Sequence, residues 1–157
     1  MTTKRSLRVL FLCSGNSCRS QMAEGWARHL VELNIEPASA GIRSSMVDPM
    51  AIRVMAEAGV DISRQRSKLV SEVWDREFDL VVTVCDAAAA ACPVFPAPVP
   101  TIHHGFDDPP SITAAMTNTE AKLAVYRRVR DEIRAFLEAL PQNASLLGTE
   151  EKSINSF

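Results

Sequence analysis

A cysteine and an arginine six positions apart mark the segment of the sequence with the clearest chemical potential. Residues 13–20 read CSGNSCRS, so Cys13 is followed by small and polar residues and then by Arg19. Successive backbone N–H groups in such a loop can bind the oxygens of an anion, and a helix that begins after the loop adds partial positive charge. The same field favours a thiolate at Cys13, and the planar guanidinium of Arg19 can hold two oxygens. The segment therefore predicts a nucleophilic cysteine that faces a bound tetrahedral oxyanion.

The other residues of this loop are expected to bind the oxyanion or to orient the thiolate. They are Ser14, Gly15, Asn16, Ser17, Cys18 and Ser20. Asn16 and Ser20 are placed to orient the thiolate, whereas Cys18 is expected to pack inside the loop rather than to react. The alternative is that Cys13 is an ordinary buried cysteine beside a glycine turn. Arg19 and the two polar side chains would then each need a separate explanation.

Chemistry on an oxyanion also needs an acid that gives a proton to the departing oxygen. Asp108 is the candidate, because it stands directly before Pro109 and a residue before proline is held extended. The same residues could form a solvated turn, and from spacing alone that interpretation would be favoured. Asp107 is the weaker candidate for the acid. His103 and His104 are expected to be ordinary residues at the edge of the sheet.

Two further cysteines, Cys85 and Cys92, carry the second chemical signal. Hydrolysis at a cysteine needs only water to finish, whereas a reduction driven by thiols obtains two electrons from each disulfide formed. Cys85 follows a β-branched run, which places it at the C-terminal end of a strand, as Cys13 is placed. The segment 86–91 is rich in alanine and could unwind to carry Cys92 across space. The alternatives are two buried small side chains, or a zinc site, whose usual close cysteine pairs are missing.

The apolar pattern of the chain predicts alternating strands and helices that would position these residues. An apolar run at Leu7–Leu12 and a β-branched run at Asp79–Val84 indicate two buried strands. Two further strands are expected at Glu36–Ala40 and at Val99–His103. Apolar residues at helical spacing indicate helices over Gln21–Leu33, from Pro49 to Gly59, over Ser67–Trp74 and along a long segment before Pro141. Thr117 and Glu120 have the spacing of a capping box at the start of this last helix, and Pro141 is expected to end it.

Strands that alternate with helices are typical of an α/β fold. We expect a single domain with a four-stranded parallel sheet, helices on both faces and an anion-binding loop after the first strand. Residues 1–141 would form this domain, and residues 142–157 would form a polar C-terminal tail. In such folds ligands bind at the C-terminal ends of the strands, which is where Cys13 and Cys85 are expected to lie.

The composition excludes several classes of function. Of the 157 residues 46% are hydrophobic and 23% are charged, as in ordinary globular proteins. The net charge of −2 argues against a broad basic surface for nucleic acid or for anionic membranes. The first apolar run is too short for an export signal, and Arg8 interrupts it. We therefore expect a cytoplasmic protein without a membrane span, in which thiols are reactive groups more often than structural bridges.

The segment Val9–Gly25, VLFLCSGNSCRSQMAEG, resembles the signature loop of the low-molecular-weight protein tyrosine phosphatase superfamily, and most of all that of its arsenate reductase branch. The resemblance extends over about Leu7–Leu140 and includes the cysteine pair and the Asp-Pro turn. It implies that residues 1–141 form a phosphatase-like arsenate reductase domain. It also implies a monomer that needs no cofactor.

The resemblance implies a role for each candidate residue. Cys13 would attack arsenate, with Arg19 clamping it and Asp108 protonating the leaving oxygen. Cys85 would then attack the Cys13 sulfur and release arsenite, and Cys92 would resolve the resulting disulfide. The Cys85–Cys92 disulfide would be reduced by thioredoxin, although glutaredoxin or mycothiol systems serve other relatives.

Some members of the superfamily bind a potassium ion beside the loop. Asn16, Glu24 and Ser39 match three of the ligand positions, but Arg66 and Lys68 stand at the other two. Because these side chains bring positive charge where the ion needs oxygen ligands, we predict no potassium site. Lys68 or Arg66 would supply the positive charge instead.

Two other functions stay open at this point. A protein tyrosine phosphatase would use the same loop and Asp108, although Pro110 stands where an aromatic residue could line a phosphotyrosine slot. The chain could also be a non-catalytic module that binds anions or senses redox state. In that case a Cys13→Ser variant should keep its function.

Overall fold

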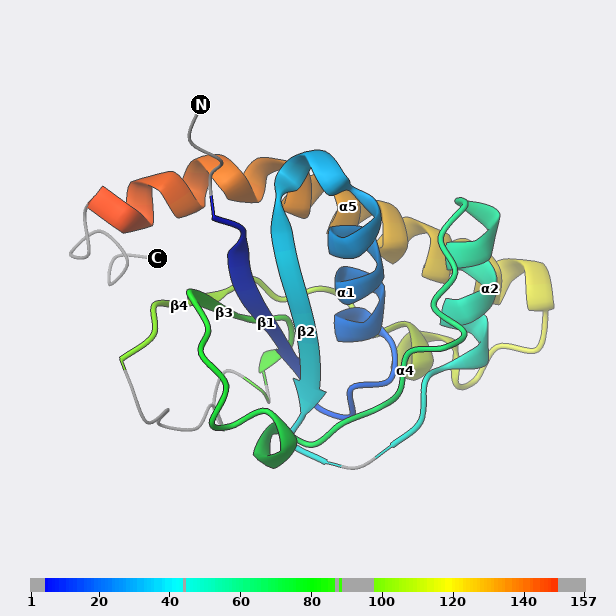
Figure 1. Cartoon of the computed structure of the whole chain (residues 1–157). Coiled ribbons are helices and arrows are strands. Elements are labelled where there is room, and N and C mark those ends of the chain that lie inside the picture. Colours follow the sequence, from blue (N-terminus) through cyan, green and yellow to red (C-terminus); the bar gives the residue numbers. More distant parts are fainter. Residues whose placement is uncertain (1–4, 44, 87, 89–97, 150–157) are drawn as a thin grey trace.

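Four parallel strands form one sheet in the order β2-β1-β3-β4 (Figure 1). They are β1 (Leu7–Cys13), β2 (Ile35–Gly41), β3 (Leu80–Thr83) and β4 (Thr101–His103). The computed structural model describes residues 5–43, 45–86, 88 and 98–149, with 141–149 described by their backbone alone. Residues 9–12 of β1 are fully shielded from solvent, so both faces of this strand are covered. The continuous apolar run in this part of the sequence suits such a strand.

The helices pack on the sheet and on one another. α1 (Arg19–His29) packs on β1 and β2, and α5 (Thr119–Thr149) packs on α1. α5 also contacts α2 (Pro49–Glu57) and the short α4 (Pro109–Thr113), and Figure 1 shows it running past α1 toward α2. The buried Trp26 of α1 donates a hydrogen bond of 3.1 Å to the Arg130 carbonyl of α5, which fixes the two helices against each other.

The predicted fold, a single-domain α/β structure with a four-stranded parallel sheet and the cysteine-bearing loop after the first strand, is confirmed. Two helices differ in extent from the prediction. The helix predicted at Gln21–Leu33 begins earlier, at Arg19, and ends at His29, after which a single 3-10 turn, η1 (Val31–Leu33), follows. The helix predicted at Ser67–Trp74 is reduced to a 3-10 turn, η2 (Val70–Glu72). Backbone bonds to the sheet compete there, since Gly41 donates to the Lys68 carbonyl over 2.8 Å.

The two ends of α5 also differ from the prediction. Asn118, and not Thr117, caps its first turn, because the Asn118 side chain accepts a hydrogen bond of 2.9 Å from the Ala121 N–H. The helix does not end at Pro141 but continues to Thr149. Proline removes one backbone donor from a helix, and good helix formers such as alanine and leucine around it can sustain the helix. The predicted division into residues 1–141 and a polar tail stays a prediction.

The parallel pairing brings the chemically interesting residues to one edge of the sheet. Leu12 of β1 is paired with Thr83 of β3, so Cys13 and Cys85 both follow at the C-terminal ends of neighbouring strands. β2 ends beside the loop that follows Cys13. A Cβ atom at Gly41 would lie 2.7 Å from the Asn16 nitrogen, so only glycine allows this close approach.

Candidate active site

Residues 13–20, here called the cradle, connect the end of β1 to the start of α1. Cys13 is the last residue of β1 and Arg19 the first of α1, so the polar loop between them lies at the C-terminal edge of the sheet. Cys18 is the N-cap of α1 but makes no side-chain cap hydrogen bond, so no side chain occupies the first N–H groups of the helix. These donors and the helix dipole suit an anion.

A pocket of about 180 Å³ opens onto the cradle. The cradle contributes Cys13, Ser14, Gly15, Ser17, Cys18 and Arg19 to its walls, and Arg43, Ser45, Asp108 and Pro110 complete them. Pockets that bury drug-sized ligands measure about 300–1,000 Å³, so this one suits a small ion. Among the described residues that line it, none is aromatic.

Two hydrogen bonds converge on the sulfur of Cys13, a buried residue that is 3% exposed. The Asn16 N–H donates to it over 3.2 Å, and the Ser20 hydroxyl lies 2.8 Å away. The direction of the second bond follows from the Asn16 side chain, whose Oδ1 accepts from the Lys68 N–H over 2.8 Å. The Asn16 Nδ2 must then be the group that donates to the Ser20 oxygen, over 2.8 Å. Ser20 keeps its own proton for Cys13, and both hydrogen bonds stabilise negative charge on that sulfur.

Asn16 holds the cradle in shape from a fully buried position. Its φ of 50° lies in the left-handed region, which asparagine enters more readily than most residues. Gln21 of α1 donates to the Asn16 carbonyl over 3.0 Å and to its Oδ1 over 2.9 Å. Gln65 donates in turn to the Gln21 Oε1 over 2.7 Å. The sequence analysis did not identify either glutamine, because their contacts depend on how α1 meets the segment before η2.

Arg19 and Asp108 lie together at the pocket. The Arg19 side chain is 11% exposed, and its Nη2 lies 3.5 Å from the Asp108 Oδ1. Its Nη1 donates to the Phe106 carbonyl over 3.1 Å. Asp108 is the extended N-cap residue of α4, directly before the helix, and its Oδ2 accepts from the Ser111 hydroxyl over 2.7 Å. The structure therefore brings the predicted acid to the cradle.

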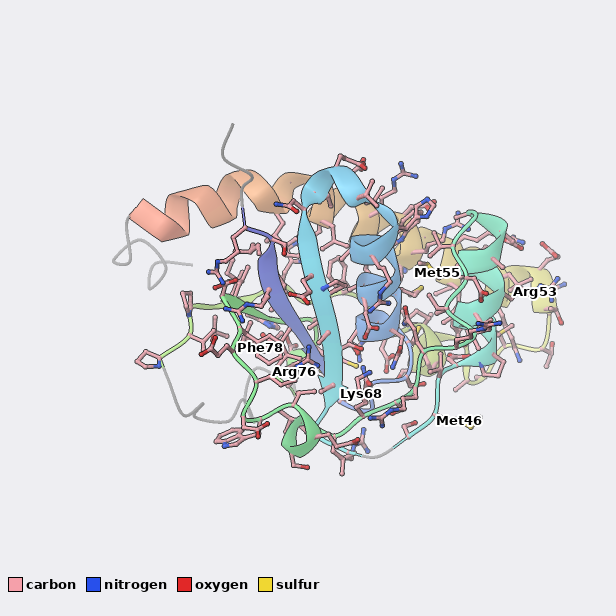
Figure 2. The ribbon with its side chains drawn as sticks, in the orientation of Figure 1. Met46, Arg53, Met55, Lys68, Arg76 and Phe78 are labelled. Atoms are coloured by element: carbon pink, nitrogen blue, oxygen red, sulfur yellow. The ribbon has the colours of Figure 1, made fainter. Side chains whose placement is uncertain are left out.

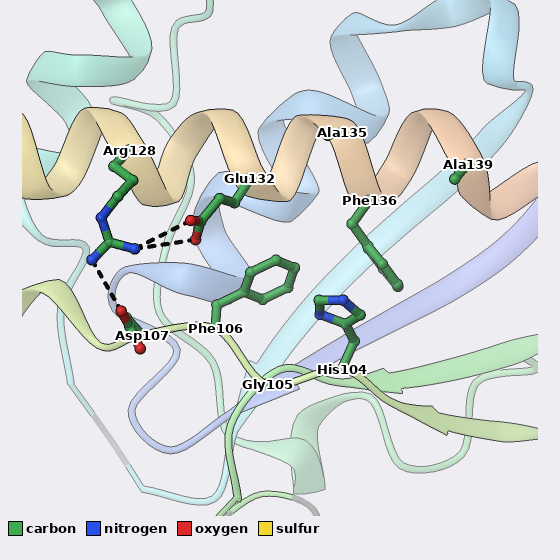
Figure 3. A pocket seen from close by; sticks show the side chains of 9 residues that line it. All are labelled: His104, Gly105, Phe106, Asp107, Arg128, Glu132, Ala135, Phe136 and Ala139. Carbon is green, nitrogen blue, oxygen red and sulfur yellow. Dashed lines mark hydrogen bonds and ion pairs between the residues drawn. The ribbon is translucent and has the colours of Figure 1, made fainter.

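Asp107 is directed to a different place. It forms an ion pair of 3.0 Å with Arg128 of α5, and it lines a second, larger pocket of about 700 Å³ (Figure 3). The rings of His104, Phe106 and Phe136 pack against one another there, so this pocket is an aromatic groove. None of the cysteines in the described part of the chain lines it. The larger of the two pockets is therefore not the one that contains the candidate catalytic residues.

Cys85 lies beside the cradle at the end of β3. Its sulfur is 3.2 Å from the Ser14 hydroxyl and accepts a hydrogen bond of 3.3 Å from the Ala88 N–H. The next residue, Asp86, lies 3.0 Å from the ring of His103, which is an exposed residue of the edge strand β4, as expected. Cys92 lies outside the described residues.

Cys18 is buried, although it contributes to the wall of the cradle pocket. Burial raises the pKa of the Cys18 thiol well above its usual range, and the nearby carboxylates of Asp48 and Asp108 act in the same direction. A thiol of this kind is a poor nucleophile. The environment is consistent with the predicted packing role of Cys18.

Glu24 and Ser39, which match potassium-ligand positions of some relatives, lie close to the ammonium group of Lys68. The Lys68 ammonium lies 3.7 Å from the Glu24 Oε1, which also accepts a hydrogen bond of 2.6 Å from Ser39 (Figure 2 shows Lys68 near the ends of β1 and β2). Burial lowers the pKa of Lys68, and the negative charge of Glu24 opposes this effect. Arg66 pairs with Glu72. The arrangement does not fit a potassium ion, because the Lys68 ammonium already lies beside the carboxylate.

No group of three or more histidine, cysteine, aspartate or glutamate side chains in the described ranges could hold a metal ion. Over the same ranges, no helix has the length and apolar character needed to span a membrane. The sequence analysis missed Arg43 and Ser45, which follow β2. Because β2 is parallel to β1, residues just after it must lie at the same edge as the cradle, and this signal could have identified them.

Comparison with known proteins gives consistent results. The family model described as low molecular weight phosphotyrosine protein phosphatase matches residues 8–146. An arsenate reductase of Halalkalibacterium halodurans is 47% identical over 125 residues, which span 80% of this chain and 88% of that protein. The resemblance predicted from the cradle is therefore confirmed.

Solved structures agree with this result. An arsenate reductase in the phosphate binding state is 33% identical with a TM-score of 0.64, and the match covers 88% of this chain and 98% of that one. The low molecular weight protein tyrosine phosphatase from T. tengcongensis is 26% identical with a TM-score of 0.70, and the match covers 88% and 99% of the two chains.

Proposed function

Because the chain belongs to the low molecular weight phosphotyrosine protein phosphatase family, we propose that it reduces arsenate to arsenite through a relay of three cysteines, Cys13, Cys85 and Cys92. The observation that carries this proposal is the position of Cys85, whose sulfur lies at hydrogen-bond distance from Ser14 of the cradle. Hydrolysis at Cys13 has no use for a second thiol at that place, whereas a reduction by thiols requires one.

In the first step the cradle binds arsenate through its backbone N–H groups and through Arg19. The Cys13 thiolate forms a sulfur–arsenic bond, and one arsenate oxygen leaves as water after it takes a proton from Asp108. The Asn16 N–H and the Ser20 hydroxyl stabilise the thiolate before the attack. Because Arg19 lies 3.5 Å from Asp108, it can bind the oxyanion at the place where Asp108 protonates the leaving oxygen.

In the second step the Cys85 thiolate attacks the Cys13 sulfur. The electron pair of the sulfur–arsenic bond stays with arsenic, which leaves as arsenite, and a Cys13–Cys85 disulfide forms. Cys92 then attacks Cys85, which frees Cys13 and leaves a Cys85–Cys92 disulfide. The two thiols oxidised in each cycle supply the two electrons that arsenic gains. Thioredoxin is the proposed donor that restores both thiols, in a cytoplasmic monomer.

Consumption of NADPH in the presence of arsenate, thioredoxin and thioredoxin reductase tests the relay. The wild type should turn over continuously, and a Cys92→Ser variant should reduce one equivalent of arsenate and then stop with a Cys13–Cys85 disulfide, detected by mass spectrometry. A Cys18→Ala variant should continue past its first turnover. If arsenate elicits no NADPH consumption with the wild type, the coupling to thioredoxin is wrong, and glutaredoxin or mycothiol systems in its place then test the donor.

Hydrolysis of aryl phosphates is the second candidate, and the structural likeness to a tyrosine phosphatase favours it. The cradle and Asp108 would serve both reactions, but Pro110 and the other described residues of the pocket offer no aromatic wall for a phosphotyrosine ring. A Cys85→Ser variant separates the two functions. It should lose arsenate reduction and keep whatever hydrolysis of p-nitrophenyl phosphate the wild type shows. If the variant lost arsenate reduction and phosphate-ester hydrolysis to the same extent, Cys85 would not be specific to the reduction.

A further inference from the structure

The backbone that follows β2 is bound to the cradle. The Ile42 N–H donates to the Cys13 carbonyl over 3.3 Å, and the Arg43 N–H donates to the Ser14 carbonyl over 2.9 Å. The Asp48 N–H donates to the Ser17 carbonyl over 2.9 Å. Three backbone hydrogen bonds therefore fix where Arg43 stands relative to the cradle, independently of its side chain.

The Arg43 side chain lines the cradle pocket with Arg19. The two arginines differ in their surroundings. Arg19 is largely buried and bound to Phe106 and Asp108, whereas Arg43 is exposed, and its guanidinium makes no hydrogen bond or ion pair with another described residue. An arginine held at a pocket wall without a protein partner keeps all five of its N–H donors for a ligand.

The charges around the pocket explain why a second cation matters. Arsenate and phosphate are mixtures of monoanion and dianion at neutral pH, with the dianion increasing as pH rises, and Cys13 has to react as a thiolate. Arg19 then cancels only the charge of the Cys13 sulfur. Without Arg43 a dianion would enter a pocket whose lining side chains carry no net positive charge. With Arg43 the lining gains the positive charge that attracts it.

We propose that Arg43 is a second oxyanion-binding residue, which recruits the dianion to the mouth of the cradle pocket and contributes to its affinity. The role in arsenate binding rests on the proposed function, whereas the role in phosphate binding does not. Because Arg43 acts on charge that substrate and transition state share, it should lower KM more than it raises kcat. Because the guanidinium is exposed, salt should weaken its effect.

Binding of inorganic phosphate to the reduced protein, measured by calorimetry, tests the proposal directly. An Arg43→Gln variant should bind phosphate about three- to tenfold more weakly at low ionic strength, as expected for one exposed charge near a dianion. An Arg43→Lys variant should keep most of the affinity. The difference between Arg43→Gln and the wild type should shrink at about 0.5 M sodium chloride, where the Debye length is only a few ångströms.

Arg53 provides a matched control, because it is an exposed arginine of α2 that does not line the pocket (Figure 2). An Arg53→Gln variant removes the same charge and should bind phosphate as the wild type does. In arsenate reduction, Arg43→Gln should raise KM by the same factor as it raises the Kd for phosphate. Unchanged phosphate affinity in Arg43→Gln, or an equal loss in Arg53→Gln, overturns the proposal. A failure of arsenate turnover alone would instead count against the proposed function.

Discussion

The Ser14 hydroxyl lies 3.2 Å from the sulfur of Cys85, although the two residues are 71 positions apart in the chain. Ser14 follows Cys13 in the cradle, and Cys85 follows β3. The Ala88 N–H donates to the same sulfur over 3.3 Å. Two donors are thus available to stabilise negative charge on Cys85, as two others are for Cys13. The second thiol of the proposed relay therefore lies beside the cradle that contains Cys13.

A Ser14→Ala variant should therefore slow the attack of Cys85. Loss of one hydrogen bond to a charged group costs about 1.5–3 kcal/mol, so disulfide formation should slow by about tenfold or more. Rapid-quench mass spectrometry of the Cys13–Cys85 disulfide in a Cys92→Ser background measures this step. A Ser14→Thr variant keeps the hydroxyl and should keep the rate. Equal rates in all three proteins would show that Ser14 does not act on Cys85.

Asp108 and Asp107 are neighbours with different surroundings, and their asparagine variants should differ accordingly. Asp108→Asn removes the proposed acid and should lower kcat for arsenate by about 10²-fold, the usual size of a general-acid effect. Asp107→Asn removes only an exposed ion pair with Arg128, which solvent screens, so the variant should keep its kcat and its stability. Steady-state kinetics of the two variants decides between them. A larger loss of kcat in Asp107→Asn than in Asp108→Asn would identify Asp107 as the general acid.

The ammonium group of Lys68 beside Glu24 predicts how the protein responds to potassium. Wild-type Tm should be the same in potassium chloride and in tetramethylammonium chloride. A Lys68→Ser variant leaves the Glu24 carboxylate with space and oxygen ligands around it, so potassium should raise its Tm. A Lys68→Met variant fills the space with an apolar side chain and should not respond. A potassium-dependent Tm or activity in the wild type would contradict this prediction.

Asp79 should make the stability of the fold depend on acid pH. Burial raises its pKa, but hydrogen bonds from the Arg8 N–H and from Arg5 outweigh burial, so the pKa is lowered from its ordinary value. A lowered carboxyl pKa stabilises the folded state above the unfolded pKa, and this contribution is lost as pH falls through the folded pKa. Asp79→Asn should therefore cost about 1 kcal/mol at pH 7. Urea unfolding should show the difference shrinking as pH falls below about 4.

The cradle could be predicted from the sequence because its parts are local. Cys13, Arg19 and the polar residues between them are contiguous, and the strand before them and the helix after them show in the apolar pattern. Asp108 needed the family resemblance, because an Asp-Pro pair alone is equally typical of a solvated turn. Arg43 could have been found only by extending the parallel pairing of β2 with β1 to the residues just after β2, because no local motif marks it.

The misjudged helix ends have physical reasons as well. Asn118 and Thr117 are both good capping residues, and only the path of the chain into α5 decides which of them reaches the Ala121 N–H. Pro141 is a helix breaker on average, yet α5 continues through it. Local propensity sets a weak preference that a few kcal/mol of surrounding structure can override.

The neighbouring positions of β1 and β3 in the sheet have a consequence for how such a protein could change its chemistry. The backbone ladder between the two strands, and not a flexible loop, sets the distance between the residues at their ends. A single cysteine codon just after β3 would therefore be enough to give an oxyanion-binding protein a second sulfur at the reacting centre. A change from hydrolysis to reduction would then need no change of the backbone. It would need one new cysteine and a further thiol that reduces the disulfide formed.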